Sequence, residues 1–417
     1  MSTADVVGQG PAAPVEEAKP GGFAGLYRRG MDNVKSGNLG VLPIVIGLVF
    51  IVVFFSFKAT NFFTADNFVN IIIQMAGTAM LAYGVVFVLL LGEIDLSISY
   101  VAGIGAITVA ELQLPGSGHE INGLLAMLVA VAVCAAIGGA QGAIVAFVGV
   151  PSFVVTLAGF MIWQGVILKV LEQPGSIIIQ DRWINYTASY FFSDTAGWII
   201  AAIITGIYAI TVLGSVIGKR RAGVPIGNPG LVIAKLVGIG VAAFGTVAIC
   251  NHALVPHGLP LAGVIVVFFL VILTFLAKRT TFGRHVYAVG GNAEAARRAG
   301  INIPRIRVIV FMISGFMAAA GGIILAANVN SVDLNFGGGT LLLNSIAAAV
   351  IGGVSLFGGR GEVRAAFLGA LVIATVSNGL NTAGYAPGII YMVTGAILLF
   401  AVTLDTIARR LQVRSGR

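Results

Sequence analysis

The sequence predicts an all-α fold, a polytopic bundle of transmembrane helices. Two observations carry this prediction: hydrophobic residues make up 58% of the chain and charged residues only 10%, and the mean hydropathy is +1.00. A bilayer core about 30 Å thick is crossed by a helix of about 20 apolar residues, and this composition supplies many such runs. The 57 glycines provide small surfaces on which helices inside lipid pack closely.

The apolar runs follow a polar N-terminal segment. Residues 1–38 are rich in Ala, Pro, Gly and charge, and are expected to form a disordered cytoplasmic tail without a signal peptide. The membrane domain is expected over 39–410 and a second cytoplasmic tail over 411–417. Twelve candidate spans lie between them: 41–58, 67–91, 94–111, 122–149, 153–171, 196–217, 231–250, 260–277, 308–328, 340–357, 364–382 and 387–405.

The second and third runs form one long apolar stretch, 67–111, which Gly92 and the acids of GEIDLS interrupt. Non-helical backbone at membrane depth occurs where protein or a cavity surrounds it. The sequence is therefore compatible with two separate spans or with a broken or re-entrant helix near 92–97, and with a total of 10 to 12 spans.

Charge is distributed unevenly between the loops. Residues 278–307 hold seven Lys or Arg against one acid, Glu294. Counting spans from a cytoplasmic N-terminus places Lys219-Arg220-Arg221 and the C-terminal arginines on the same side, and the positive-inside rule assigns that side to the cytoplasm. The opposite loops carry Glu111, Glu120, Glu172, Asp181, Asp194 and Asp333. The net charge of +8 thus orients the chain in a lipid membrane, and no nucleic-acid partner is expected.

The basic loop has local helix signals of its own. Asn292 is a good N-cap, and Glu294 lies in the first turn, where its charge suits the helix dipole. Arg297 and Arg298 come near the end, and Gly300 can supply a left-handed terminating residue. These signals predict a short helix near 293–299, held crosswise between two spans.

The run TTFGRHVYAVGGNAEAARRAGINIPRIR, at the centre of this loop, resembles the cytoplasmic coupling loop of sugar ABC-importer permeases, in the superfamily of branched-chain amino acid and ribose permeases. Two further runs match in order. GEIDLSISYVAGIGA at 92–106 is similar to the family's GGIDLS segment, with Glu93 in place of Gly, and AAAVIGGVSLFGGRGEVRAAFLGALVIATVSNGLN at 347–381 is similar to its C-terminal IGG-SL-GGRG segment. The resemblance covers most of 41–405. An extra apolar hairpin at about 196–250 resembles the xylose-type branch.

The resemblance implies a permease subunit that moves a sugar, with a pentose such as D-xylose favoured, across the inner (plasma) membrane of a bacterium. It also implies a separate ATP-binding subunit, an extracytoplasmic sugar-binding protein and a homodimer. ATP and magnesium are expected on the ATPase, so this chain is expected to be a transport subunit without bound cofactor and not an enzyme. The residues expected to couple to the ATPase are Gly283, Arg284, Gly290, Gly291, Asn292, Glu294, Arg297, Arg298 and Gly300, with Gly283 and Gly290 allowing close contacts in the docking groove.

Polar residues inside the predicted spans are candidates for the translocation path, because amides and hydroxyls bind uncharged sugars. Hydrogen bonding between helices is the alternative role for each of them. Asp95 has two interpretations, a cap on the following helix with help from Ser97, or direct contact with solute. The candidates are Glu93, Asp95, Ser97, Thr156, Gln164, Asn344, Asn378 and Asn381, of which the last two share a helical face.

Other chemistries have weak support in the sequence. The P-loop pattern G-x-x-x-x-G-K-[ST] does not occur, and the four histidines lack metal-site spacing, so no metal site is expected. No nucleophile or acid–base constellation indicates an intramembrane enzyme. The main alternative is a self-sufficient secondary transporter with Glu93 and Asp95 as a proton or sodium site at a broken helix.

Overall fold

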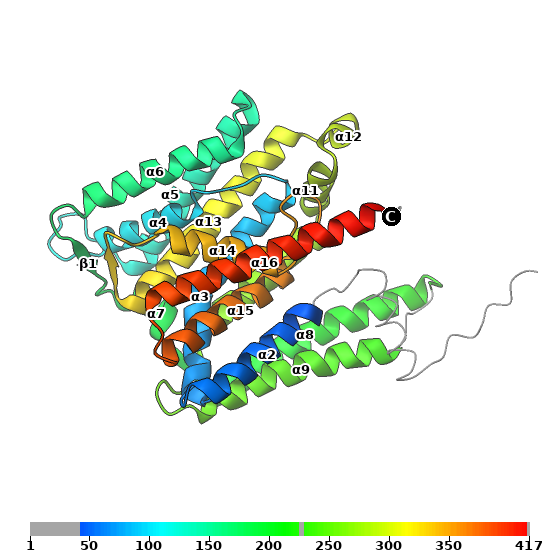
Figure 1. Ribbon diagram of the computed structural model, residues 1–417, viewed down its shortest axis with the longest axis horizontal. Coiled ribbons are helices and arrows are strands. Elements are labelled where there is room, and N and C mark those ends of the chain that lie inside the picture. Colours follow the sequence, from blue (N-terminus) through cyan, green and yellow to red (C-terminus); the bar gives the residue numbers. More distant parts are fainter. Residues whose placement is uncertain (1–41, 225–228, 415–417) are drawn as a thin grey trace, which may run out of the picture. The chain divides into compact units, whose positions relative to one another are not determined.

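The computed structural model describes residues 42–224 and 229–414 (Figure 1). The predicted tail 1–38 lies outside the described residues. Eight described helices are long and apolar enough to cross a membrane, and four shorter apolar helices accompany them. These twelve helices coincide with the twelve predicted runs, so the prediction of a polytopic helical bundle is confirmed.

Eight of the helices form two sets of four. The first set is α3 (Ala65–Leu90), α4 (Ile98–Leu112), α5 (Gly123–Ala143), which a π-helical turn η1 (Ile144–Val148) extends, and α6 (Ser152–Val170). The second is α13 (Ile303–Val329), α14 (Gly339–Ile351), α15 (Val363–Thr382) and α16 (Pro387–Arg414). In each set a long helix is followed by a short one, and the two sets run in opposite directions. Inverted repeats with broken helices of this kind are common in transporters.

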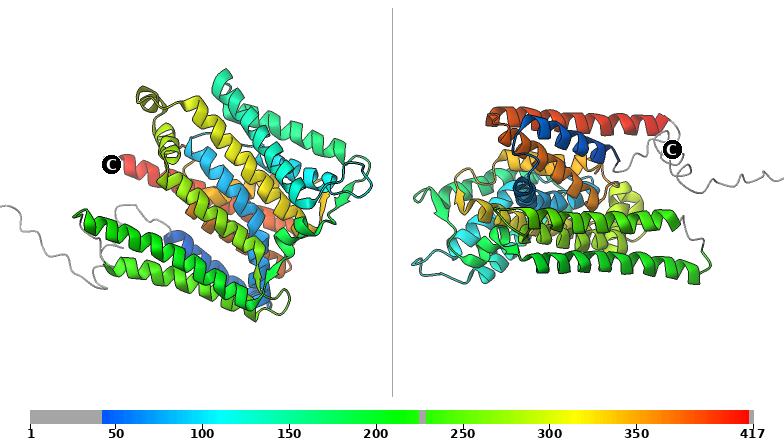
Figure 2. Two further views of the ribbon diagram at one scale, coloured as in Figure 1. Left: turned by 180° about the vertical axis from the view of Figure 1, so that it is seen from behind. Right: turned by 90° about the horizontal axis from the view of Figure 1, so that it is seen from below.

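The remaining elements surround these two sets. They are α2 (Leu42–Lys58), β1 (Ser176–Ile178), α7 (Arg182–Ser189), β2 (Phe191–Phe192), α8 (Asp194–Arg221), α9 (Pro229–His252), β3 (Leu259–Pro260), α10 (Leu261–Arg279), α11 (Thr281–Gly291), α12 (Ala293–Arg298) and β4 (Ser331–Asp333). Strand β1 pairs antiparallel with β4, and β2 with β3. Helices α8 and α9 form the extra hairpin and lie side by side (Figure 2).

The core is built around α3 and α13, whose side chains are mostly buried. Helix α13 packs on α4 and α5, and α3 makes the corresponding contacts with α14 and α15. Glycines set these distances: a Cβ on Gly315 would overlap the carbonyl of Cys134, and one on Gly322 would overlap the carbonyl of Ala102. Small residues at helix contacts let backbones approach closely inside a membrane.

The short helices correct two predicted spans. The run 94–111 forms a helix only from Ile98, 15 residues long, and 340–357 forms α14, only 13 residues long. At 1.5 Å per residue these reach about 20 to 23 Å, less than a bilayer core. The predicted break near 92–97 is present, because α3 ends at Leu90. The matching break before α14, at 330–338, was not predicted.

The spanning helices define two ends of the bundle. The end that carries α11 and α12, called here the α11 end, also holds the start of α13 and the basic end of α8 (Figure 1). The other, called here the β4 end, holds the β1–β4 pair, α7 and the predicted acidic loops. Helix α16 continues to Arg414, past the predicted start of the C-terminal tail at 411, and 415–417 lie outside the described residues.

Candidate functional site

The basic loop contains two helices at the α11 end. Helix α12 matches the predicted short helix: the Asn292 side chain accepts from the Ala295 N–H at 2.9 Å. Gly300 has φ +82° and ends it, with Ile301 N donating to the Ala296 carbonyl in a Schellman arrangement. Helix α11, which the sequence reasoning missed, begins at Thr281, and its N-cap Thr280 accepts from Gly283 N through its side chain at 3.1 Å.

One face of α11 and α12 is buried and the other is exposed. Val286, Val289 and Ala296 pack into the main core. The predicted coupling residues on the exposed face are Arg284, Gly291, Asn292, Glu294, Arg297, Arg298 and Gly300. Glu294 forms ion pairs with Arg297 at 2.7 Å and Arg298 at 3.3 Å, which hold both guanidinium groups on one side of the short helix.

Gly283 and Gly290, two of the predicted coupling residues, lie against backbone of this chain. A Cβ on Gly283 would overlap the carbonyls of Leu276 and Ala277, at the end of α10. A Cβ on Gly290 would overlap the Leu90 carbonyl oxygen and lie 2.8 Å from Gly359 N. Both glycines therefore make close contacts with this chain's own backbone, and their role in docking stays a prediction.

Gly290 belongs to a contact point that unites all three motifs singled out in the sequence. Gly359 N donates to the Leu90 carbonyl at 2.9 Å, and a Cβ on Gly358 would lie 2.8 Å from Gly290 O and 2.9 Å from Gly92 N. Gly92, Gly358 and Gly359 have φ of +77°, +86° and +71°, which favours glycine at each. We call Leu90, Gly92, Gly290, Gly358 and Gly359 the glycine junction.

Polar contacts connect α11 and the end of α10 to the start of α15, beside the glycine junction. The Tyr287 hydroxyl donates to the Gly361 carbonyl at 2.7 Å, and the Lys278 ammonium lies 2.9 Å from Glu362. Arg364 contacts the same carboxylate at 2.6 Å. Burial raises the pKa of Glu362, but hydrogen bonds from Lys278 and Arg364 outweigh this effect and hold the pKa below its ordinary value.

The loop between α3 and α4 carries the two acids that the sequence singled out. Glu93 forms an ion pair with Arg307 of α13 at 2.9 Å, and its side chain is 14% exposed. Asp95 is buried, and its carboxylate accepts from Ser97 N at 3.0 Å, from Ser97 Oγ at 2.7 Å and from Ser314 Oγ on α13 at 2.7 Å. Both acids therefore fasten this loop to α13, and Asp95 also stabilises the start of α4.

Helices α5 and α6 hold the same loop from the other side. Ser97 Oγ lies 2.8 Å from the Gln141 side chain of α5, and Ile94 N donates to Ser152 Oγ at 3.2 Å. The Thr156 hydroxyl donates to the Ser152 carbonyl at 2.8 Å and lies 3.2 Å from Ile94 O. Thr156 thus serves helix contacts in this structure, which was the alternative role considered for it.

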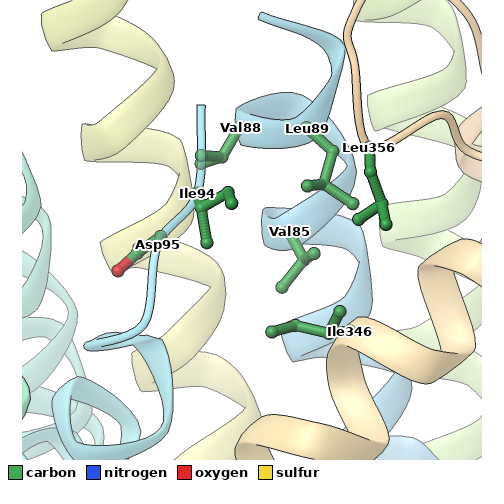
Figure 3. A pocket seen from close by; sticks show the side chains of 7 residues that line it. All are labelled: Val85, Val88, Leu89, Ile94, Asp95, Ile346 and Leu356. Atoms are coloured by element: carbon green, nitrogen blue, oxygen red, sulfur yellow. The ribbon is translucent and has the colours of Figure 1, made fainter. Parts of the chain in front are cut away.

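A small cavity of about 140 Å³ lies beside this loop. Its lining is apolar except for Asp95, and Figure 3 shows the Asp95 carboxyl turned away from the other labelled side chains. The lining residues are Val85, Val88, Leu89, Ile94, Asp95, Ile346 and Leu356. A cavity with this lining offers a sugar almost no hydrogen-bond partner. It leaves unfilled apolar space next to the loop between α3 and α4.

The other path candidates are dispersed. Gln164 is half-buried on α6, and Asn344 is half-buried on α14. Asn378 is buried and donates to Gln74 of α3 at 3.3 Å, whereas Asn381 is exposed near the end of α15. In this structure Asn378 therefore makes a contact between helices, which was the alternative role for it, and the role of both residues in the path stays a prediction.

Sequence reasoning missed Ser314, Gln141 and the partnership of Arg307 with Glu93. Arg307 was counted only as one basic residue of the loop, and the partner residues lie far apart in the sequence. No local pattern indicates these pairs, since each depends on how α5 and α13 pack against the break after α3.

Comparison with known proteins identifies the family of this chain. The family model described as branched-chain amino acid transport system / permease component matches residues 67–402. The chain belongs to this family of transport permeases. It is thus a multi-pass membrane protein that serves as a transport subunit.

Individual relatives match over nearly their whole length. The xylose transport system permease protein of Escherichia coli (strain K12) is 33% identical over 395 residues, 94% of this chain and 95% of the relative. The protein of the same name from Haemophilus influenzae is 32% identical over 381 residues, 90% and 98% of the two chains. The ribose import permease protein of E. coli (strain K12) is 30% identical over 361 residues, 87% and 92%. No solved structure matches this chain.

Proposed function

We propose that this chain is the membrane-spanning subunit of an ATP-binding-cassette importer for a sugar, and that the sugar is a pentose such as D-xylose. Relatives whose names specify xylose or ribose support a sugar, and the presence of the α8–α9 hairpin supports the xylose type. The inner membrane of a bacterium is the proposed location, with the α11 end and both termini in the cytoplasm.

A separate ATPase docks on the exposed face of α11 and α12. The observation that carries this proposal is the glycine junction. Helix α11, which precedes the α12 surface with Arg297 and Arg298, packs directly against the end of α3 and against the loop that follows α14. A displacement of α11 toward the bundle would therefore press on the backbone at Leu90 and Gly359. ATP and magnesium are bound by the partner, and this chain converts the partner's motion into opening and closing of the path.

The break after α3 is the proposed moving part. It is connected to the glycine junction at Gly92 and fastened to α13 through Glu93 and Asp95. Two copies of the chain form the path, and an extracytoplasmic sugar-binding protein delivers sugar to the β4 end. The switch has two states, which the ATPase biases from one end and the loaded binding protein from the other.

An ion-coupled secondary transporter is less well supported. That mechanism needs Glu93 and Asp95 to exchange a proton or sodium ion at the broken helix. Glu93 is instead paired with Arg307, and Asp95 accepts three hydrogen bonds from Ser97 and Ser314. Both carboxylates are engaged in structural contacts.

Affinity purification from the native membrane, with mass spectrometry of the proteins that accompany the chain, tests the docking proposal. We expect an ATP-binding subunit with the wild type and its loss from the variant Arg297→Ala/Arg298→Ala. The matched control is Arg220→Ala/Arg221→Ala, which removes the same charge from exposed positions at the same end of the bundle. Equal recovery of the ATPase with both variants would contradict docking on α12.

A further inference from the structure

The second broken helix forms a polar bowl at the β4 end. The break between α13 and α14, residues 330–338, lines a cavity of about 340 Å³ together with the adjoining helix ends. Its polar lining includes Asn328, Ser331, Asp333, Asn335 and Thr340, and Phe336 adds an aromatic ring. We call this cavity the β4 bowl. It reaches the size of ordinary small-molecule sites, about 300 Å³ or more, which the apolar cavity beside Asp95 does not.

Three side chains of the β4 bowl have unused hydrogen-bonding capacity. Asn328, Asn335 and Thr340 are exposed and form no side-chain hydrogen bond with any residue in the two described stretches. They supply two amides and a hydroxyl, groups that both donate and accept, as a polyhydroxylated solute requires. Asp333, by contrast, is partly engaged, because its carboxylate accepts from Asn335 N at 3.0 Å and holds the turn.

The β4 bowl packs at Gly337 against α4, the helix that follows the other break. Gly337 has φ +82°, and a Cβ there would lie 2.7 Å from Ser99 O and 3.2 Å from the Tyr100 ring. Asp95 and Ser97, which precede α4, lie within a few residues of this contact along the chain. The first turn of α4 therefore connects the β4 bowl to the loop that the glycine junction controls.

We infer that the β4 bowl is a sugar subsite, where solute released at the β4 end is held before it passes into the membrane domain. Asn328, Asn335 and Thr340 hydrogen-bond its hydroxyls, and Phe336 packs against its apolar face. Discontinuous helices provide the solute sites of many transporters, and the bowl is formed by such a discontinuity. The inference rests on the proposed function for its solute, and it adds a location that is distinct from the coupling surface.

The test measures solute uptake and ATP hydrolysis in the same proteoliposomes, using the complete importer, a saturating amount of its binding protein and radiolabelled D-xylose. The variant is Asn328→Leu/Thr340→Val, which replaces an amide and a hydroxyl with apolar groups that have the same number of heavy atoms. We expect uptake to fall about tenfold or more, the effect of losing two hydrogen bonds to the solute. ATP hydrolysis stimulated by the loaded binding protein should stay within about twofold of wild type, since the ends of the coupling path are unchanged.

Asn61→Leu is the matched control, because Asn61 is an exposed amide in the turn before α3 at the same end of the bundle. It should leave both rates unchanged. Both altered positions of the test variant are exposed, so folding should be preserved, and Thr340→Val alone, with an expected loss of about threefold or more, provides a milder second variant.

Two results would overturn the inference. Unchanged uptake in both bowl variants would show that the bowl does not hold the solute, and a parallel loss of uptake and stimulated ATP hydrolysis would make it part of the docking surface for the binding protein. The proposed function is tested separately, by measuring whether uptake by the wild-type importer requires ATP. If it does not, the ratio of variant to wild-type uptake still decides the role of the bowl.

Discussion

Replacing Gly290 with alanine should weaken the contact between α11 and the bundle. The added methyl group would overlap the Leu90 carbonyl oxygen and lie 2.8 Å from both Leu90 C and Gly359 N, all of them backbone atoms that no rotamer change can move. Overpacking against backbone typically destabilises by about 1–3 kcal/mol, and the conformational gain of Gly to Ala in a helix offsets about 0.5–1 kcal/mol of this. We expect a net loss, with α11 displaced from Leu90.

The neighbouring Gly291 provides a matched control, since nothing lies within 4 Å of a Cβ at that position. Gly291→Ala should therefore leave stability unchanged or raise it slightly. Thermal unfolding of the detergent-solubilised chain can be followed with a thiol-reactive dye, because the two cysteines of the sequence, Cys134 and Cys250, are both buried. The midpoint should fall for Gly290→Ala and not for Gly291→Ala. Equal midpoints for the two variants would show that Gly290 is not tightly packed against Leu90.

The remaining predictions concern the charged contacts. Glu93→Gln leaves Arg307 without its ionic partner in a largely buried position, and should lower the free energy of unfolding by about 1–3 kcal/mol. Glu93→Gln combined with Arg307→Gln should lose less than the sum of the two single changes. Additive losses would argue against a direct ion pair. Glu362 has a lowered pKa, so its ion pairs stabilise the fold at pH values above the unfolded-state pKa. This stabilisation is lost as pH falls through the folded-state pKa. The unfolding midpoint of Glu362→Gln should therefore approach that of wild type as the solution is acidified below pH 4.5. A hydrogen bond with the Ala253 carbonyl, and then the nearby Asp194, raise the pKa of His257. The difference in unfolding midpoint between wild type and His257→Gln should therefore be largest below pH 6.5 and should vanish as pH rises through the folded-state pKa. A difference that grows with pH would contradict the pairing of His257 with Asp194.

Local features of the fold could be predicted because their causes are local. The apolar runs gave the spanning helices, and Asn292 with Gly300 gave the bounds of α12 to within one residue. Gly92 and the neighbouring acids indicated the break after α3 because charge is costly at membrane depth. Each of these signals lies within a few residues of the structure that it specifies.

The second break, between α13 and α14, was not predicted because it has no local signal in the sequence. The apolar run that begins at 340 continues through the end of α14 at Ile351 into VSLF without a charge, so hydropathy alone extends the span to 357. The preceding polar segment 330–338 resembles an ordinary connecting loop in sequence. Only the packing of Gly337 against the first turn of α4 shows that it enters the bundle.

The candidate site was predicted only in part. The three motifs were identified, but their convergence at the glycine junction depends on contacts between segments some 200 residues apart, such as Leu90 with Gly290. Asp95 was expected either to cap α4 or to contact solute, and its hydrogen bonds with Ser97 and Ser314 favour the structural role. The roles of the coupling residues and of the path candidates remain predictions.

The proposed coupling of uptake to ATP hydrolysis can be measured in proteoliposomes that contain this chain with its proposed ATPase and binding protein, by following the entry of radiolabelled D-xylose. ATP should be required on the side of the membrane that α11 faces, and dissipating proton and sodium gradients should leave the rate unchanged. Uptake that proceeds without the ATPase and stops when an ion gradient is dissipated would contradict the account and favour an ion-coupled carrier.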